Sequence, residues 1–105
     1  KNENFIDETR FACSFSRGKF RIKKWGRVKI KAGLKLHQLS DSIIKLGLQE
    51  IDDQEYIHVL EELLVKKANE LKSENKFVKQ QKMLRFAMSK GFEYDLILSV
   101  LQSLD

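Results

Sequence analysis

The sequence contains no proline and only five glycines among its 105 residues. Proline interrupts helices, and both residues mark turns, so their scarcity favours long uninterrupted helices over a turn-rich β fold. The single cysteine, Cys13, excludes an intramolecular disulfide and any cysteine-based zinc cluster. Because Cys13 stands among Phe11, Ala12 and Phe15, we expect its thiol to be buried and inert rather than nucleophilic.

Sequence patterns typical of enzymes, metal sites and membrane proteins are also missing. There is no phosphate-cradling glycine loop, Ser/His/Asp set or zinc spacing, and neither His37 nor His58 has a second nitrogen ligand four residues on. The acidic pairs 52–53 and 61–62 need no catalytic explanation at capping or solvent-facing positions. We therefore expect no enzyme, no metal and no cofactor. Without a signal peptide or a membrane-length apolar run, we expect a cytoplasmic protein.

Positive charge is concentrated in the first part of the chain. Residues 1–40 carry eleven basic and three acidic side chains, whereas residues 41–105 carry nine basic and twelve acidic ones. The stretch 17–35, RGKFRIKKWGRVKIKAGLK, contains nine Lys or Arg and no acid, with apolar residues set between the charges. Clustered cations gain free energy by releasing counterions from phosphates, so this stretch indicates a polyanionic partner.

The spacing of apolar residues predicts helices at about 8–21, 41–51 and 52–72, with Asp7, Ser40 and Asp52 as N-terminal caps. A fifth helix carries Phe77, Leu84, Ala87 and Met88 and ends at Gly91, the residue best suited to a left-handed C-terminus. The apolar stripe of a sixth helix consists of Leu96, Ile97, Val100, Leu101 and Leu104.

Residues 20–32 are ambiguous, because apolar and basic residues alternate about Trp25-Gly26 as they do in a β-hairpin. Taken locally, hairpin and helix are equally supported. An internal repeat decides between them: residues 6–11 match 51–56, and the apolar positions of 39–51 match those of 92–104. The ambiguous segment then aligns with residues 77–90, which show no alternation, so we predict a helix at about 24–37.

Each copy of the repeat contains three helices. One such unit cannot bury its own apolar faces, so neighbouring units pack side by side. We therefore predict an all-α fold in which tandem three-helix repeats form an elongated, curved helical array. The expected boundaries are 1–51 for the basic repeat and 52–105 for the acidic or mixed one.

Two residue patterns carry a resemblance to a known family. The first copy contains Asp7-x-x-Arg10-Phe11-Ala12 and then Lys24-Trp25-Gly26-x-x-x-Ile30-x-x-x-Leu34. The second contains Tyr56, Lys66-Lys67 and Lys90-Gly91-Phe92-x-x-Asp95-x-Ile97. These patterns resemble the central and C-terminal repeats of the RecX family, bacterial regulators of RecA. Nearly the whole chain is covered, and it is similar to a RecX protein without its first repeat. Gln38-Leu39 departs from the pattern, which often has glycine before the apolar residue.

The resemblance implies a non-enzymatic negative regulator of recombination and DNA repair that lies in the groove of the RecA–DNA filament and inhibits its growth and activity. The expected partners are then the RecA filament and, weakly and nonspecifically within it, DNA. We expect a monomer with no membrane partner. Two other classes stay open: a sequence-independent or helix-turn-helix DNA-binding module acting without RecA, and a neutral scaffold in which the basic charge has no role.

Six cations are the candidate contacts with the filament or DNA: Arg17, Arg21, Lys24, Arg27, Lys31 and Lys35. We expect the first three to share one helical stripe and the last three another. Basic residues also solubilise helix surfaces, but nine of them without an acid exceed what solubility requires. Trp25 could stack on a base, although we interpret it as a packing anchor between the first two helices.

Overall fold

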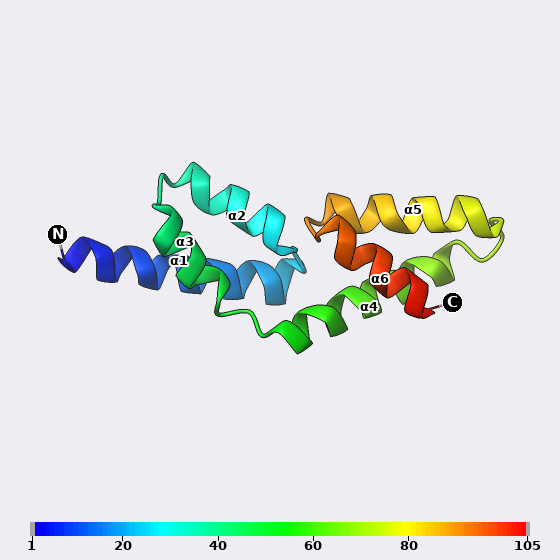
Figure 1. Cartoon of the computed structure of the whole chain (residues 1–105), viewed down its shortest axis with the longest axis horizontal. Coiled ribbons are helices and arrows are strands. Elements are labelled where there is room, and N and C mark those ends of the chain that lie inside the picture. The colour runs from blue at the N-terminus through cyan, green and yellow to red at the C-terminus, as the bar shows by residue number, and fades with distance from the viewer. Residues whose placement is uncertain (1, 105) are drawn as a thin grey trace.

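The computed structural model describes residues 2–104, with side chains from residue 5 onward, and that range folds into six α-helices (Figure 1). They are α1 (Asn2–Lys23), α2 (Arg27–Leu36), α3 (Asp41–Leu48), α4 (Asp53–Glu70), α5 (Lys76–Ser89) and α6 (Tyr94–Leu104). The described residues contain no strand. The all-α prediction is therefore confirmed, and the hairpin alternative for residues 20–32 is wrong.

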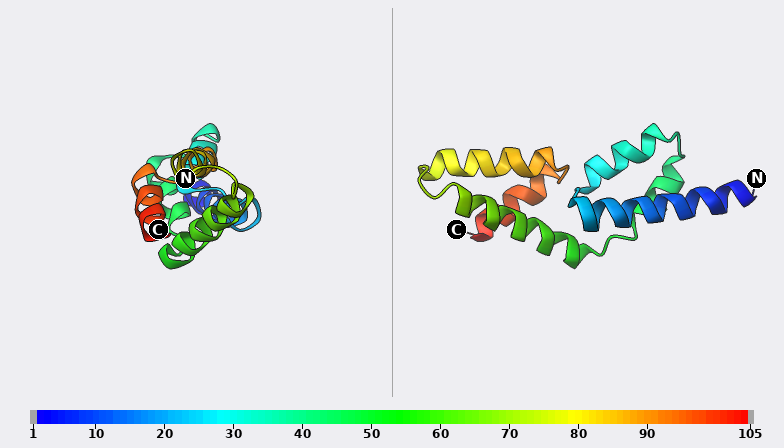
Figure 2. Two further views of the ribbon diagram at one scale, coloured as in Figure 1. Left: turned by 90° about the vertical axis from the view of Figure 1, so that its right-hand side faces the viewer. Right: turned by 180° about the vertical axis from the view of Figure 1, so that it is seen from behind.

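The helices form two groups of three. Helix backbones in the described residues approach each other closely only among α1, α2 and α3 on one side and among α4, α5 and α6 on the other. Figure 1 shows the groups end to end, and the left view of Figure 2 looks along the long axis. The molecule measures 56 × 23 × 21 Å, so it is elongated, as a tandem repeat array requires.

Side-chain caps begin three of the helices. The Ser40 hydroxyl accepts from the Ile43 N–H at 3.3 Å, and an Asp52 carboxylate oxygen accepts from the Glu55 N–H at 2.9 Å. Asn75 caps α5 in the same way. The prediction that Asp7 caps the first helix is wrong, because α1 already begins at Asn2. Residues 2–6 contain no proline or glycine that would delay the start of that helix.

The connection between α1 and α2 includes residues that the sequence predicted to be helical. Lys24 has a φ of 59°, in the left-handed region, and this ends α1. The N–H groups of Lys24 and Trp25 donate to the carbonyls of Phe20 and Lys19, each at 3.1 Å. The predicted start of the second helix at residue 24 is therefore wrong, and α2 begins at Arg27. At the end of α5, Gly91 has a φ of 95°, which confirms the left-handed terminus predicted there.

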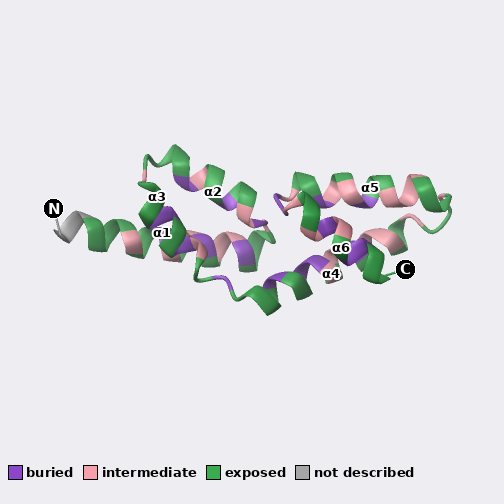
Figure 3. Ribbon diagram, in the orientation of Figure 1, coloured by how far each residue is buried: buried purple, intermediate pink, exposed green. Residues whose placement is uncertain are grey.

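One continuous cluster of buried apolar side chains runs through both groups of helices (Figure 3). Where α3 crosses α1, a Cβ added to Gly47 would lie 2.8 Å from the Ala12 carbonyl oxygen, so a glycine lets the two backbones approach. On α5 the buried residues are Met83 and Ala87. The sequence predicted Phe77 among the apolar residues of this helix, but its side chain is 71% exposed and lies outside the core.

The thiol of Cys13 is partly buried rather than fully buried, and its Sγ lies 3.9 Å from the Leu46 carbonyl oxygen. Burial, and after it the nearby Glu50 carboxylate, raise the pKa of this thiol. The protonated form therefore dominates at neutral pH, which makes Cys13 a poor nucleophile.

Candidate basic interaction surface

The two groups of helices meet where the α1–α2 connection touches the turn between α5 and α6 (Figure 1). The Gly26 N–H donates to the Lys90 carbonyl at 2.7 Å, and the Val28 N–H donates to the Gly91 carbonyl at 3.0 Å. A Cβ added to Gly26 would lie 2.4 Å from the carbonyl carbon of Gly91. Only a residue without a side chain fits there, so this junction requires the glycine of the Trp25-Gly26 pair.

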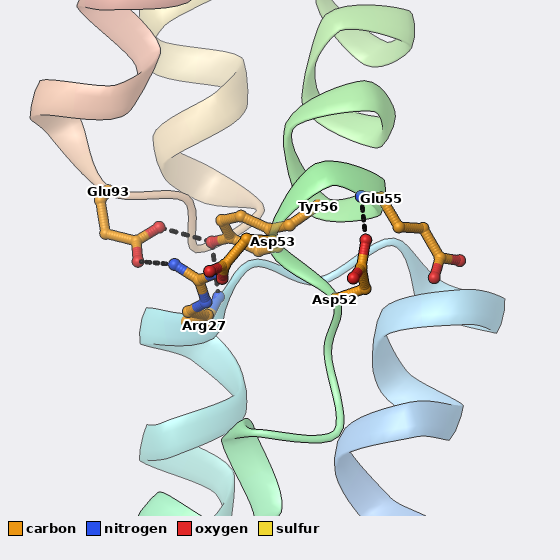
Figure 4. A network of polar contacts seen from close by, with 6 residues as sticks. All are labelled: Arg27, Asp52, Asp53, Glu55, Tyr56 and Glu93. Carbon is orange, nitrogen blue, oxygen red and sulfur yellow. Dashed lines mark hydrogen bonds and ion pairs between the residues drawn. The ribbon is translucent and has the colours of Figure 1, made fainter.

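Arg27 is the centre of a polar network across the same junction (Figure 4). Its guanidinium pairs with Asp53 at 2.6 Å and with Glu93 at 3.3 Å, and lies 4.0 Å from the centroid of the Tyr56 ring. The Tyr56 hydroxyl accepts from the Arg27 backbone N–H at 2.9 Å and donates to Glu93 at 2.5 Å. These contacts join α2, the start of α4 and the α5–α6 turn into one unit.

Tyr56 is fully buried, between the aromatic rings of Phe20 and Phe92 with centroids at 5.8 and 5.0 Å. Burial, and after it the hydrogen bond to Glu93, raise the pKa of Tyr56 far above its usual value. The phenol therefore stays protonated and keeps its donor to Glu93 throughout the physiological pH range.

The first predicted stripe of cations is only partly formed. Arg17 pairs with Glu50 at 2.6 Å, and Arg21 lies 3.9 Å from Glu55, so both arginines face acids of the α3–α4 region. Lys24 lies beyond the end of α1, so the expectation that it shares a helical stripe with these two is wrong. The left-handed turn at Lys24 breaks the periodicity on which that expectation depended.

The second predicted stripe, Arg27, Lys31 and Lys35, lies on α2 and lines a groove of about 780 Å³. Lys45 of α3 adds a fourth cation to the lining. Three acids also line the groove, namely Asp41, Asp52 and Asp53, together with the apolar side chains of Ile44, Leu48 and Ile51. The groove therefore carries both charges over an apolar base, which suits a protein segment better than a uniform polyanion.

Sequence reasoning did not find the acids that pair with the arginines, because Glu50, Asp53, Glu55 and Glu93 lie 26 to 66 residues from their partners. One signal was available for the network. Tyr56 matches Phe11 in the internal repeat, and the two side chains differ by the hydroxyl that makes the hydrogen bonds.

The described residues contain no group of three His, Cys, Asp or Glu placed to hold a metal ion. The imidazole of His37 lies against the rings of Phe11 and Phe15, and that of His58 lies 3.6 Å from Glu62 on its own helix. Within the same residues, none of the helices is both long and apolar enough to cross a bilayer. Trp25 is partly buried and packs with its ring 6.5 Å from that of Phe15, as expected of an anchor between α1 and α2.

The fold defines this chain as an all-α protein of tandem three-helix repeats. The family model for the second three-helix domain of RecX matches residues 7–48, and that for the third matches residues 53–101. The chain belongs to the RecX family and covers its later repeats.

Relatives named regulatory protein RecX include those of Clostridium acetobutylicum, 31% identical over 96% of this chain, and Leuconostoc mesenteroides, 30% identical over 90%. The matches cover 48% and 35% of those proteins, so the chain spans half their length or less. The crystal structure of RecX from Lactobacillus salivarius superimposes with a TM-score of 0.86 at 27% identity, over 98% of this chain and 70% of that one. These relatives are regulatory proteins by name.

Proposed function

We propose that this chain is part of a RecX-type regulator that binds the RecA nucleoprotein filament and inhibits its extension and activity. The observation that carries the proposal is the match of both three-helix groups, in order, to consecutive RecX domains. The relatives are regulatory proteins by name, and RecA is the partner that membership of this family implies.

The shape and charge of the molecule support a filament as the partner. A body 56 Å long and only 23 × 21 Å across can follow an extended groove and contact more than one subunit. The groove on α2 offers Lys31 and Lys35, for which no ion pair occurs in the described residues, beside the acids Asp41 and Asp52. Such mixed charge gives register and specificity against a protein surface.

The test is the DNA-dependent ATPase activity of RecA on single-stranded DNA, titrated with the full-length protein that contains this chain. We expect suppression of ATP hydrolysis at substoichiometric or stoichiometric ratios. The variant K31E/K35E should require at least tenfold more protein for half inhibition, because it reverses the two cations that α2 presents to the groove without an ion pair. The control K72E/K76E changes the net charge equally at exposed positions elsewhere and should act like the wild type.

Absence of inhibition by the wild-type protein at any ratio would contradict the proposal. A protein that binds DNA tightly and inhibits RecA only by occupying the DNA would favour the alternative of a DNA-binding module that acts without RecA. Equal loss of inhibition in both double variants would show that net charge, and not the groove, is responsible.

A further inference from the structure

A second groove lies at the far end of the second group of helices, and we call it the end groove. It has a volume of about 420 Å³ and is formed by the end of α4, the start of α5 and the end of α6. These three segments meet at the end of the molecule away from the junction (Figure 1). The apolar part of the lining consists of Val65, Ala68, Met83, Leu101 and Leu104.

The internal repeat relates the end groove to the first group of helices. Its register matches the buried residues of α2, Ile30 and Leu34, to the buried residues of α5, Met83 and Ala87. The two pairs have the same spacing of four residues on their helices. The start of α5 therefore corresponds to the start of α2, which lies at the junction between the two groups.

The surface that corresponds to the end groove is covered at the junction. In the same register, Leu104 corresponds to Ile51, yet Ile51 is 5% exposed and Leu104 is 40% exposed. Gln80 of the end groove corresponds to Arg27, whose guanidinium lies 4.0 Å from the centroid of the Tyr56 ring. The start of α4 thus supplies the first group with an aromatic cover, and in the second group the corresponding surface is open.

Another three-helix unit cannot cover the end groove in the way that the second group covers the first. The junction requires Gly26, because an added Cβ there would lie 2.4 Å from the carbonyl carbon of Gly91. The residue that corresponds to Gly26 is Lys79. In addition, α5 begins at Lys76, a full turn before the residue that corresponds to the start of α2. The end groove therefore suits a single segment rather than a whole repeat.

The rim of the end groove is cationic. Lys76 and Lys79 line it, and neither has an ion pair among the described residues. Glu74 also lines the groove, but its carboxylate is paired with Lys82 at 3.0 Å. An apolar base beside two available ammonium groups complements a segment that carries carboxylates next to an apolar side chain.

We propose that the end groove binds an acidic segment of a partner protein through one aromatic side chain. The aromatic ring packs on the apolar lining, and neighbouring carboxylates pair with Lys76 and Lys79. The junction uses the same chemistry within the molecule, because the start of α4 presents the Tyr56 ring and pairs Asp53 with Arg27 at 2.6 Å. The inference goes beyond the proposed function, and its test needs no RecA.

The test is the fluorescence anisotropy of a labelled peptide titrated with the full-length protein that contains this chain. The peptide has the sequence of residues 50–61, EIDDQEYIHVLE, which carries five acids and one tyrosine. We expect saturable binding to the wild type. A peptide with serine in place of the tyrosine should bind at least tenfold more weakly, because buried aromatic anchors contribute most of the affinity of such contacts.

Two double variants of the protein locate the binding site. V65S/L104S should weaken binding of the peptide at least fivefold, because it removes two exposed apolar side chains of the lining. I57S/M88S is the matched control: both residues lie in the second group, outside the end groove, and have similar exposure. It should bind the peptide within twofold of the wild type.

A charge variant tests the rim independently of the apolar lining. K79E should weaken binding at least threefold, whereas K24E, with the same change of net charge in the first group, should bind within twofold of the wild type. Lys79 lies near the N-terminus of α5, where the helix dipole favours a glutamate, so K79E should remain folded. Circular dichroism checks this for every variant.

Three results would overturn the proposal. The first is an anisotropy that shows no saturation at about 100 µM wild-type protein, because specific contacts of this kind bind more tightly. The second is an equal loss of binding in V65S/L104S and I57S/M88S. The third is self-association of the wild type in analytical ultracentrifugation that V65S/L104S abolishes, because a second copy of the protein would then be the occupant of the groove.

Discussion

The hydroxyl group of Tyr56 connects both groups of helices. It accepts from the Arg27 N–H at the start of α2 and donates to Glu93 in the α5–α6 turn. A buried donor or acceptor left without its partner costs about 1–3 kcal/mol. Tyrosine therefore contributes more to the stability of the fold at this position than phenylalanine would.

Tyr56→Phe is therefore expected to lower the free energy of unfolding by about 1–3 kcal/mol, because it leaves the Arg27 N–H and one Glu93 oxygen without a partner. Urea unfolding followed by circular dichroism measures the change. Tyr94→Phe is the matched control: this residue is 50% exposed, so its change should stay within about 0.5 kcal/mol. Equal effects of the two substitutions would contradict the role given to the network.

Gln38 takes the place at which the RecX pattern often has glycine, and it adopts a φ of 59°. In the left-handed region a residue with a side chain is about 1–2 kcal/mol less stable than glycine. Glycine also gives the unfolded chain more conformational freedom, and this offsets about half of that difference. Gln38→Gly should accordingly raise the free energy of unfolding by about 0.5–1 kcal/mol.

The matched control for this substitution is Gln49→Gly, at the C-terminal cap of α3 with a φ of −67°. Glycine relieves no strain there and adds entropy to the unfolded chain, so it should destabilise by about 0.5–1 kcal/mol. Thermal unfolding of both variants checks the sign. A loss of stability in both would show that Gln38 is not strained.

At the scale of elements, two glycines of the same basic stretch have opposite requirements. Gly18, inside α1, has no atom within 4 Å of an added Cβ, whereas Gly26 is in backbone contact with Gly91. Glycine inside a helix is less favourable than alanine by about 0.8–1 kcal/mol. Gly18 thus costs helix stability without a packing reason, and Gly26 is needed for the junction between the groups.

Gly18→Ala should stabilise the protein by up to about 1 kcal/mol, and Gly26→Ala should destabilise it by at least about 1–3 kcal/mol. The second effect arises because the new methyl group must push the α1–α2 connection away from the α5–α6 turn. The midpoints of urea unfolding for the two variants measure the difference. A tolerated Gly26→Ala would mean that the junction can open without loss.

At the scale of the whole molecule, the arrangement of the two groups depends on the contacts at their junction. Close approach of helix backbones in the described residues stays within each group, so the connection is made by the backbone contacts at Gly26, by the Arg27 network and by the Tyr56 ring packed between Phe20 and Phe92. A protein that binds along an extended groove needs a fixed angle between its two groups of helices, because a flexible junction would add an ordering cost to binding.

Arg27→Met keeps an apolar stem over the Tyr56 ring but leaves Asp53 and Glu93 without their cation. We expect it to loosen the joint and to raise the radius of gyration measured by small-angle X-ray scattering above that of the wild type. Arg21→Met is the control, because its single ion pair at 3.9 Å is exposed and of little energetic value. Unchanged scattering for both would show that the backbone contacts and the packing of Tyr56 hold the groups together without the ion pairs.

Much of the fold was predictable from local patterns. The spacing of Leu60 and Leu64, the caps at Ser40 and Asp52 and the terminus at Gly91 act within one or two helical turns, and each occurs as predicted. The internal repeat resolved residues 20–32 as helical where periodicity alone did not. The errors at Asp7 and Lys24 concern helix ends, where local signals are weakest.

The sequence by itself determined the all-α class, the six helices and the presence of a basic stretch, because helical periodicity and capping are encoded by near neighbours. Only the tertiary structure decided which of the basic residues are neutralised. Arg17 and Arg27 meet acids far along the chain, while Lys19 and Lys29 meet Trp25 instead. The physical reason is that an ion pair depends on how helices cross, and crossing is set by packing between segments distant in the sequence.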